Sequence, residues 1–375
     1  MAFERLVRTQ PQLAVRLEGE LGSGKLPQSV LFYGAPYSSR MTAAVELALS
    51  LTGESGRYVR LDSANLIIMP SRDMPIRIAA MRQLCARQRN RKSLDNLVHE
   101  TGILLSSYHD ALYTNSAKDG FEAASELAEV LYGIPQSLEG GELDRFLSDF
   151  DKAYAKLSAR GRRSQAFTID QIRAIQSFLQ TGGDRDKAVI LENIEDVTVG
   201  AMNSILKVLE EPPSGAHIIL LSRNARRILP TILSRVRQYE FPPVSLERQS
   251  ALISDLFFSQ GNSVEDFIVS AAGLDLAGLE ARADELVHQT LVKGRLLDDE
   301  TLSSLAAFLD EMGSWDLFVT KLAAICEDGF LHGVLEPVRA KRALELLSAC
   351  QRDATVYAQN RRVMLERIQR GLVAL

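Results

Sequence analysis

Short apolar runs and amphipathic stretches alternate along the first two thirds of this chain. Six runs have the length and composition of buried strands, at residues 29–33, 58–62, 65–69, 187–193, 217–222 and 236–241. Stretches with helical periodicity or composition lie around and between them, at residues 9–24, 42–52, 168–180 and 198–213. Apolar strands that alternate with helices are typical of a parallel sheet covered on both faces, so we expect an α/β fold.

Two of the predicted helices carry boundary signals. Thr168 is a suitable N-terminal cap for the helix over 168–180, because its hydroxyl can accept a hydrogen bond from an unpaired amide of the first turn. Pro212 and Pro213 end the helix over 198–213, because proline lacks the amide hydrogen that a helix interior requires. These signals fix the limits of two elements beside the predicted sheet.

Two further regions are helical in pattern and contain almost no strand signal. Within residues 76–163, the stretches 121–133 and 143–161 are amphipathic, and we predict a helical insertion at about residues 86–163. After Pro242-Pro243 the chain again lacks β-branched runs, and a division falls near 293–299. The expected organisation is a core with its insertion followed by two helical regions, over residues 1–242, 243–298 and 299–375.

Composition narrows the class of protein. The 43 basic and 48 acidic residues give a net charge of −5, which argues against a protein that coats nucleic acid by bulk charge. The three cysteines are far apart in the sequence, so we expect neither a disulfide framework nor a four-cysteine zinc site. No signal peptide and no membrane-spanning run is evident, and the five histidines lack metal-ligand spacing. We therefore expect a soluble cytoplasmic protein without a metal, and Trp315 as a core residue.

The segment GAPYSSRM, residues 34–41, lies between a predicted strand and a predicted helix, where a phosphate-binding loop would lie. The segment retains Gly34 and Pro36 of such a loop. Three positions depart from its pattern: Ser39 replaces a glycine, Arg40 the lysine and Met41 the hydroxyl residue that holds Mg²⁺. This segment is either a degenerate nucleotide site or a simple strand-to-helix turn.

The end of the strand over 187–193 carries the other half of such a site. Glu192 can replace the carboxylate that supports a metal, but Asn193 cannot position a water molecule as a base. Thr42 could take the hydroxyl role only in a register shifted by one residue. We therefore predict that the chain binds no nucleotide cofactor and does not hydrolyse ATP.

A longer pattern lies downstream of the loop. Residues 203–213 are NSILKVLEEPP and residues 229–236 are LPTILSRV, in the order N-x-L-L-K-x-L-E-E-P-P and L-P-T-I-x-S-R-C of the bacterial clamp-loader branch of the AAA+ family. The segments 25–34, 168–175 and 360–372 resemble the family as well. The resemblance covers most of the chain and is strongest over 165–241.

The resemblance implies an AAA+ core followed by a helical lid and a helical collar. It also implies that Arg235, with Ser234, is presented in trans to the ATP of a neighbouring subunit. The implied partners are the gamma/tau and delta subunits, with the sliding clamp and primer-template DNA reached through the assembled complex. This chain has Val236 in place of the family's cysteine and lacks its four-cysteine zinc module. The helical insertion stands in place of that module, and its role is not implied.

Several alternatives remain open at this stage. Arg235 can instead form a surface salt bridge. The chain can be an active ATPase that uses Arg40 and Thr42, or a helical scaffold outside replication. The basic run Arg82, Arg87, Arg89, Arg91 and Lys92 either contacts DNA phosphates or forms a solvated helix face. The cluster Arg223, Arg226 and Arg227 belongs either to a subunit interface or to a solvated loop.

Overall fold

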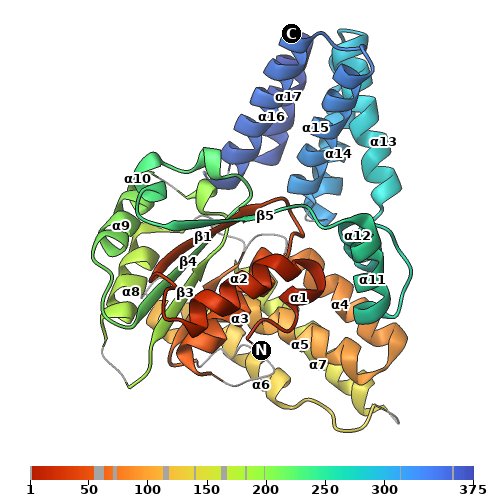
Figure 1. Ribbon diagram of the computed structural model, residues 1–375. Helices are drawn as coiled ribbons and strands as arrows, with labels where there is room; N and C mark the ends of the chain where they lie inside the picture. The colour runs from red at the N-terminus through yellow and green to blue at the C-terminus, as the bar shows by residue number, and fades with distance from the viewer. Residues whose placement is uncertain are drawn as a thin grey trace. The chain divides into compact units, whose positions relative to one another are not determined.

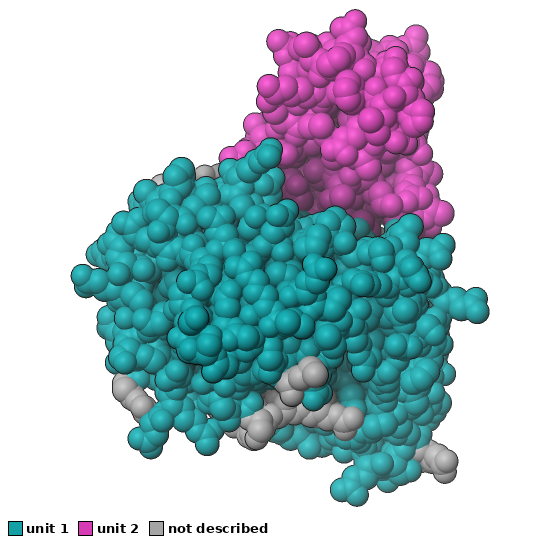
Figure 2. All heavy atoms as spheres, in the orientation of Figure 1, with its two compact units in different colours: residues 1–163, 167–272 teal, residues 164–166, 273–375 magenta. Residues whose placement is uncertain are grey.

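The computed structural model describes residues 2–54, 63–70, 74–112, 118–138, 141–161, 167–181, 184–197, 199–312, 314–356 and 359–375. The chain divides into two compact units, the first formed by residues 1–163 and 167–272 and the second mainly by Gly273–Leu375 (Figure 2). The expected strand over 58–62 lies outside the described residues.

The first unit is built on a five-stranded parallel sheet. Its strands are β1 (Ser29–Gly34), β2 (Leu66–Met69), β3 (Lys187–Leu191), β4 (Ala216–Ser222) and β5 (Arg237–Phe241). Their order across the sheet is β2-β3-β4-β1-β5, so β1 lies between β4 and β5 although it comes first in the chain. The C-terminal ends of all five strands therefore meet at one edge of the sheet, where open α/β folds bind ligands.

Alternate residues of each strand enter two different cores. In β1, Val30 and Phe32 belong to the core on one face, and Leu31 belongs to the core on the other. The same alternation separates Ile68 from Ile67 in β2. Because successive side chains of a strand point to opposite faces, the continuous apolar runs mark a sheet that is buried on both sides.

Helices cover both faces of this sheet (Figure 1). One side carries α1 (Leu6–Thr9), α2 (Pro11–Gly22) and α3 (Arg40–Thr52), which share a core with the helices that follow β2. The other side carries α8 (Ile169–Gln180), α9 (Val199–Glu210) and the short α10 (Pro230–Leu233). Thr168 caps α8 and exchanges hydrogen bonds with Gln171 in a capping box, as the sequence predicted for this cap.

The connection from β2 to β3 holds the helical insertion. It contains α4 (Met74–Gln88), α5 (Arg91–Ser106), α6 (Lys118–Tyr132) and α7 (Glu142–Gly161) before α8. The helical segment starts at Met74, so the predicted boundary near residue 86 falls inside α4. Cys85 lies buried in this region, and all three cysteines of the chain are buried and free.

Helices α11 (Leu246–Phe257) and α12 (Val264–Ala271) pack against the insertion. The carbonyl groups of the last three residues of α11 accept hydrogen bonds from Gln88, Lys92 and Asn96 on α4 and α5. A helix leaves its last carbonyls without partners of its own, so these three side chains complete the end of α11.

The second unit is helical in the residues that the structure describes. It contains α13 (Leu276–Val287), which continues as a π-helical turn over His288–Val292, then α14 (Asp299–Met312), α15 (Trp315–Leu331), α16 (Pro337–Val356) and α17 (Arg361–Val373). Trp315 is buried in its core, as predicted. No described helix combines the length and apolar character needed to span a bilayer.

The predicted α/β fold class is confirmed: a parallel-sheet core with a helical insertion, followed by helical regions. Except for the run over 58–62, every predicted strand is present in the described residues, within two residues of its expected limits. By contacts, residues 243–272 group with the sheet and not with the helices after Gly273. The division into core, lid and collar at 242/243 and 298/299 stays a prediction.

Candidate functional site

Gly34 ends β1 at the edge of the sheet where the loop over residues 34–41 begins. It pairs with Phe241 of β5, and a Cβ atom at Gly34 would lie 2.1 Å from the carbonyl oxygen of Phe241. Its φ of +156° is also unfavourable for other residues. Strand packing therefore requires a glycine here whether or not a phosphate binds.

The rest of the loop has the backbone shape of a tight turn, and several of its side chains are packed into the fold. Ser39, at the position of the missing glycine, has φ 71° in the left-handed region, and Tyr37 has φ 56°. Arg40 begins α3 and is only 7% exposed, so its side chain is buried against the fold. Tyr37 and Met41 pack onto the hydrophobic core, whereas Pro36 is exposed.

Two segments distant in sequence hold this loop. The side-chain amide of Gln10 donates to the carbonyl oxygens of Ser38 (3.4 Å) and Pro242 (2.7 Å), and so joins the loop to the segment after β5. The hydroxyl of Ser38 is buried and has no hydrogen-bond partner among the described residues. The loop is thus fixed by protein contacts on the side of β5.

Glu192 and Asn193 follow β3 at the same edge of the sheet. The amide of Glu192 donates to the carbonyl of Met69 at 3.0 Å, which extends the pairing with β2 by one residue. Asn193 has φ 53°, and its Oδ1 is buried without a hydrogen-bond partner in the described part of the chain. The structure therefore brings the loop and the Glu192-Asn193 pair to one edge, as the sequence predicted.

Arg77 of α4 places a positive charge beside this edge. Its guanidinium donates to Glu100 of α5 at 2.6 Å, and both side chains are largely buried. Burial works against the charge, but the negative groups of Glu100, Tyr37 and Glu192 outweigh it and raise the pKa of Arg77 above its ordinary value. A cation of the protein itself therefore pairs with Glu100 and lies within electrostatic range of Glu192.

A half-buried histidine lies next to this ion pair. His99 of α5 contacts Arg5 at 3.3 Å between Nε2 and the guanidinium. Burial lowers the pKa of His99 to about 4, and the positive charges of Arg5 and Arg77 act in the same direction against that of Glu100. The ring is therefore neutral at physiological pH.

Arg235 lies at the opposite edge of the sheet. It comes just before β5, whose Arg237 pairs with Val30 at the start of β1, whereas Gly34 ends β1 four residues later. At about 3.3 Å per residue, this register puts at least ~13 Å along the strand direction between the two positions. Arg235 is therefore separated from the loop of its own chain.

The guanidinium of Arg235 is held by three acceptors. One nitrogen donates to the Thr231 carbonyl (2.8 Å) and to the Ser234 hydroxyl (3.1 Å), and the other donates to Glu210 (2.6 Å). The side chain stays 33% exposed. The salt bridge expected as the alternative for Arg235 is thus present, between the two segments of the signature pattern.

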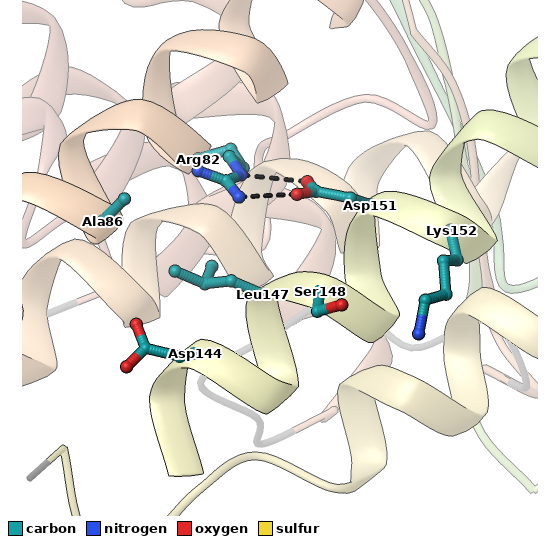
Figure 3. Close-up of a pocket in the computed structure, with 7 residues that line it drawn as sticks. All are labelled: Arg82, Ala86, Asp144, Leu147, Ser148, Asp151 and Lys152. Atoms are coloured by element: carbon teal, nitrogen blue, oxygen red, sulfur yellow. Dashed lines mark hydrogen bonds and ion pairs between the residues drawn. The ribbon is translucent and has the colours of Figure 1, made fainter. Parts of the chain in front are cut away.

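Most of the basic run that follows Arg77 is engaged in ion pairs. Arg82 forms two hydrogen bonds with Asp151 (Figure 3), and Arg89 forms two with Asp144. Arg91 pairs with Asp95 at 3.1 Å. The groove in Figure 3 is lined by this interface of α4 and α7. Arg82 and Arg89 thus pair with α7, while Arg87, Arg89 and Arg91 are exposed, as a solvated face requires; contact with DNA phosphates stays a prediction.

Sequence reasoning did not assign three of these residues. Arg77 and Glu100 are distant from the loop in sequence, and no motif marks them. Glu210 belongs to the pattern LEEPP, but its pairing with Arg235 depends on how α9 and α10 pack. Arg226 and Arg227 are exposed on the loop after β4, as both interpretations of that cluster allow. Among the described residues, no group of three or more His, Cys, Asp or Glu is placed to hold a metal.

A protein-family model described as "DNA polymerase III, delta subunit" matches residues 147–245. The match includes α8, β3, α9, β4 and β5, and thus both the Glu192-Asn193 pair and Arg235. It stops before α11, the first helix after β5, and excludes the loop at Gly34.

Curated relatives match parts of the chain. The DNA polymerase III subunit delta-prime of Pseudomonas aeruginosa is 41% identical over 78 residues, which are 20% of this chain and 23% of that protein. The gamma/tau subunit of Mycobacterium tuberculosis is 28% identical over 174 residues, covering 45% of this chain and 30% of that protein. The chain thus spans about a quarter of the length of the first of these relatives.

Among solved structures, a DNA polymerase III gamma subunit-related protein from Thermotoga maritima aligns over 96% of this chain and 98% of its own. Its sequence identity is 17% and its TM-score 0.38, too low to support any further inference. Over part of its length, this chain is thus similar to the delta-prime and gamma/tau subunits of DNA polymerase III.

Proposed function

We propose that this chain is a non-hydrolysing clamp-loader subunit of a DNA polymerase III holoenzyme. It contributes Arg235 to the ATP site of a neighbouring subunit while the sliding clamp is loaded on primed DNA. Its partners are the gamma/tau and delta subunits in the cytoplasm, and the clamp and primer-template DNA are reached through the complex. The lid and collar helices after residue 242 serve assembly.

The observation that carries the proposal is the position of Arg235. It is exposed at the edge opposite to the loop at Gly34, so it is suited to reach a second molecule and not its own loop. An arginine that reaches a transferred phosphoryl group from a neighbouring chain stabilises its developing charge, which contributes roughly 10³–10⁵ in rate in GTPases.

The composition of the loop edge supports the absence of hydrolysis. Arg40 is buried, Met41 packs on the core and Asn193 carries no carboxylate. The positive charge of Arg77 already balances the acidic groups at this edge. A degenerate loop of this kind leaves no lysine for the phosphates and no hydroxyl for Mg²⁺.

The test replaces Arg235 with alanine in the complex reconstituted with gamma/tau and delta. We expect Arg235→Ala to assemble normally and to slow hydrolysis at the neighbouring site by at least about tenfold, because the charge-stabilising group is lost. Single-turnover ATP hydrolysis measures this effect. Arg173→Ala is the matched control, since Arg173 is an exposed arginine on α8. An Arg235→Ala complex with unchanged hydrolysis contradicts the proposal.

The matches to gamma/tau subunits are longer and favour one alternative function. In this alternative the chain is a divergent active ATPase that uses Arg40 and Thr42. Equilibrium binding of Mg-ATP to the isolated chain separates the two functions. Tight binding favours the ATPase, and its absence favours the non-hydrolysing subunit. A chain that fails to co-purify with gamma/tau and delta would point instead to a scaffold outside replication.

A further inference from the structure

Glu210 ends α9 and is the contact of Arg235 that comes from a different element. We infer that Glu210 is a positioning residue that holds the Arg235 guanidinium in the direction from which it meets a neighbour's nucleotide. This inference rests on the proposed function, because it assigns a role in presenting the same arginine.

The hydrogen bonds of the Arg235 guanidinium come from two segments of the chain. Thr231 and Ser234 belong to the same turn as Arg235 and hold one nitrogen of the guanidinium close to its own backbone. Glu210 holds the other nitrogen at 2.6 Å and thereby fixes the plane of the group. A planar guanidinium held at both of its terminal nitrogens has one orientation, whereas a hydrogen bond at a single nitrogen leaves the group free to rotate.

Donors remain for an external oxyanion. Arginine has five N–H donors, and over the described residues three of those of Arg235 are engaged. Two are left for a phosphate oxygen, which a bidentate arginine contact requires. Glu210 therefore orients the group without exhausting its donors.

Both members of the pair stand on rigid supports. Leu209 precedes Glu210 and is 5% exposed, and Ile232 and Val236 flank the turn of Arg235 in the same hydrophobic core. Pro212 and Pro213 follow shortly after Glu210 and prevent α9 from continuing. The carboxylate and the arginine turn are thus anchored to one packed layer.

Stability does not account for this pair. Arg235 and Glu210 are 33% and 49% exposed, and ion pairs between exposed side chains contribute little net stability. What such a contact changes is the freedom of a long side chain, because a free arginine populates many rotamers. Loss of this contact should therefore lower the rate of the reaction that Arg235 assists and have little effect on the stability of the chain.

The experiment compares Glu210→Ala, Glu210→Gln and the control Glu211→Ala in the reconstituted complex. Glu211 is the adjacent exposed carboxylate, and no side-chain contact of it with Arg235 is present among the described residues. We expect Glu210→Ala to lower kcat of the neighbouring site about fivefold with KM for ATP within twofold. Glu210→Gln keeps an oxygen acceptor of the same length and should stay within about twofold of the wild type. Glu211→Ala should have no effect.

The double variant Glu210→Ala/Arg235→Ala supplies the second readout. If Glu210 acts through Arg235, the double variant is no slower than Arg235→Ala. A slow Arg235→Ala with an unchanged Glu210→Ala overturns this inference and leaves the proposed function intact. A faster Glu210→Ala also overturns it, because the carboxylate would then restrain Arg235. An unchanged Arg235→Ala removes the proposed function itself.

Discussion

The two edges of the sheet differ in how their charged groups are used. At the edge that holds Gly34 and Glu192, the nearby cation is Arg77, which is largely buried and paired with Glu100. At the opposite edge, Arg235 is partly exposed and keeps donors for another molecule. One edge satisfies its charges within the chain, and the other presents a charge outward.

This difference shows that two edges of one sheet can hold their charged side chains in different degrees of exposure. Open α/β sheets bind ligands at the C-terminal ends of their strands, so the loop edge is the ordinary location of chemistry. Here the architecture of that edge persists for reasons of packing, as the contact between Gly34 and Phe241 illustrates. Each of the following predictions tests one side of this comparison.

The largest effect is expected at Gly34. In Gly34→Ala the new Cβ atom would overlap the carbonyl of Phe241, so β1 or β5 must shift, and we expect a loss of at least ~3 kcal/mol in the free energy of unfolding. Urea denaturation of the nucleotide-free chain measures it. Gly19→Ala is the control, because Gly19 has open space in α2 and alanine there should stabilise the chain by about 0.5–1 kcal/mol.

A Gly34→Ala variant as stable as the wild type would contradict the packing role of this glycine. In that case the contact with Phe241 would not explain why the loop starts with a glycine. A role of Gly34 in phosphate binding would then be the alternative explanation.

A smaller effect is expected at Arg77. Arg77→Met leaves the Glu100 carboxylate without its cation, and Glu100 is only 12% exposed with one oxygen already lacking a partner among the described residues. Because the pair is not completely buried, we expect a loss of about 2 kcal/mol in the free energy of unfolding. Lys156→Met, which breaks the exposed pair with Glu126, should cost less than about 0.5 kcal/mol.

The same variant has a spectroscopic signature. Removing the charge of Arg77 takes away one of the groups that depress the pKa of His99, so that pKa should rise from about 4 towards the ordinary value of about 6.5. Titration of the His99 ring by NMR tests this, with Lys156→Met as the comparison. An unchanged titration in Arg77→Met would mean that the charge of Arg77 does not reach this part of the edge.

The smallest effect is expected in the basic run. Arg82→Ala breaks an ion pair between α4 and α7, and Arg89→Ala breaks one between α7 and the residue that follows α4. The side chains of both pairs are partly or mostly exposed. We expect losses below about 1 kcal/mol, and no change in the salt dependence of DNA binding by the complex. A lower salt slope in either variant would show that these arginines contact phosphates, and would give the insertion a direct part in DNA binding.

Local patterns in the sequence were sufficient for much of the fold. The strands at 29–34 and 216–222 are continuous apolar runs, and the cap at Thr168 depends on residues within one turn. The position of the degenerate loop beside Glu192 followed from the rule that parallel strands end at one edge. Each of these features is decided within a few residues or by strand direction.

The remaining features depend on residues that are distant in the sequence. Gly34 meets Phe241 only because β5 pairs with β1, and Arg82 meets Asp151 only because α7 folds back on α4. A basic run looks the same in sequence whether or not its partners lie on another helix. Pairing between helices of the insertion, where no motif guides the alignment, is therefore the part that sequence reasoning could not supply.

The hydrogen bonds from Gln88, Lys92 and Asn96 to the end of α11 have a consequence for folding. During synthesis α4 and α5 leave the ribosome long before Leu246–Phe257. The Phe257 carbonyl also accepts a hydrogen bond from the Ser259 hydroxyl just after α11, but the other three side-chain partners of this turn come from helices already made. Contacts of such large sequence separation form late and slowly. The order of synthesis thus makes the insertion a template on which α11 completes its final turn.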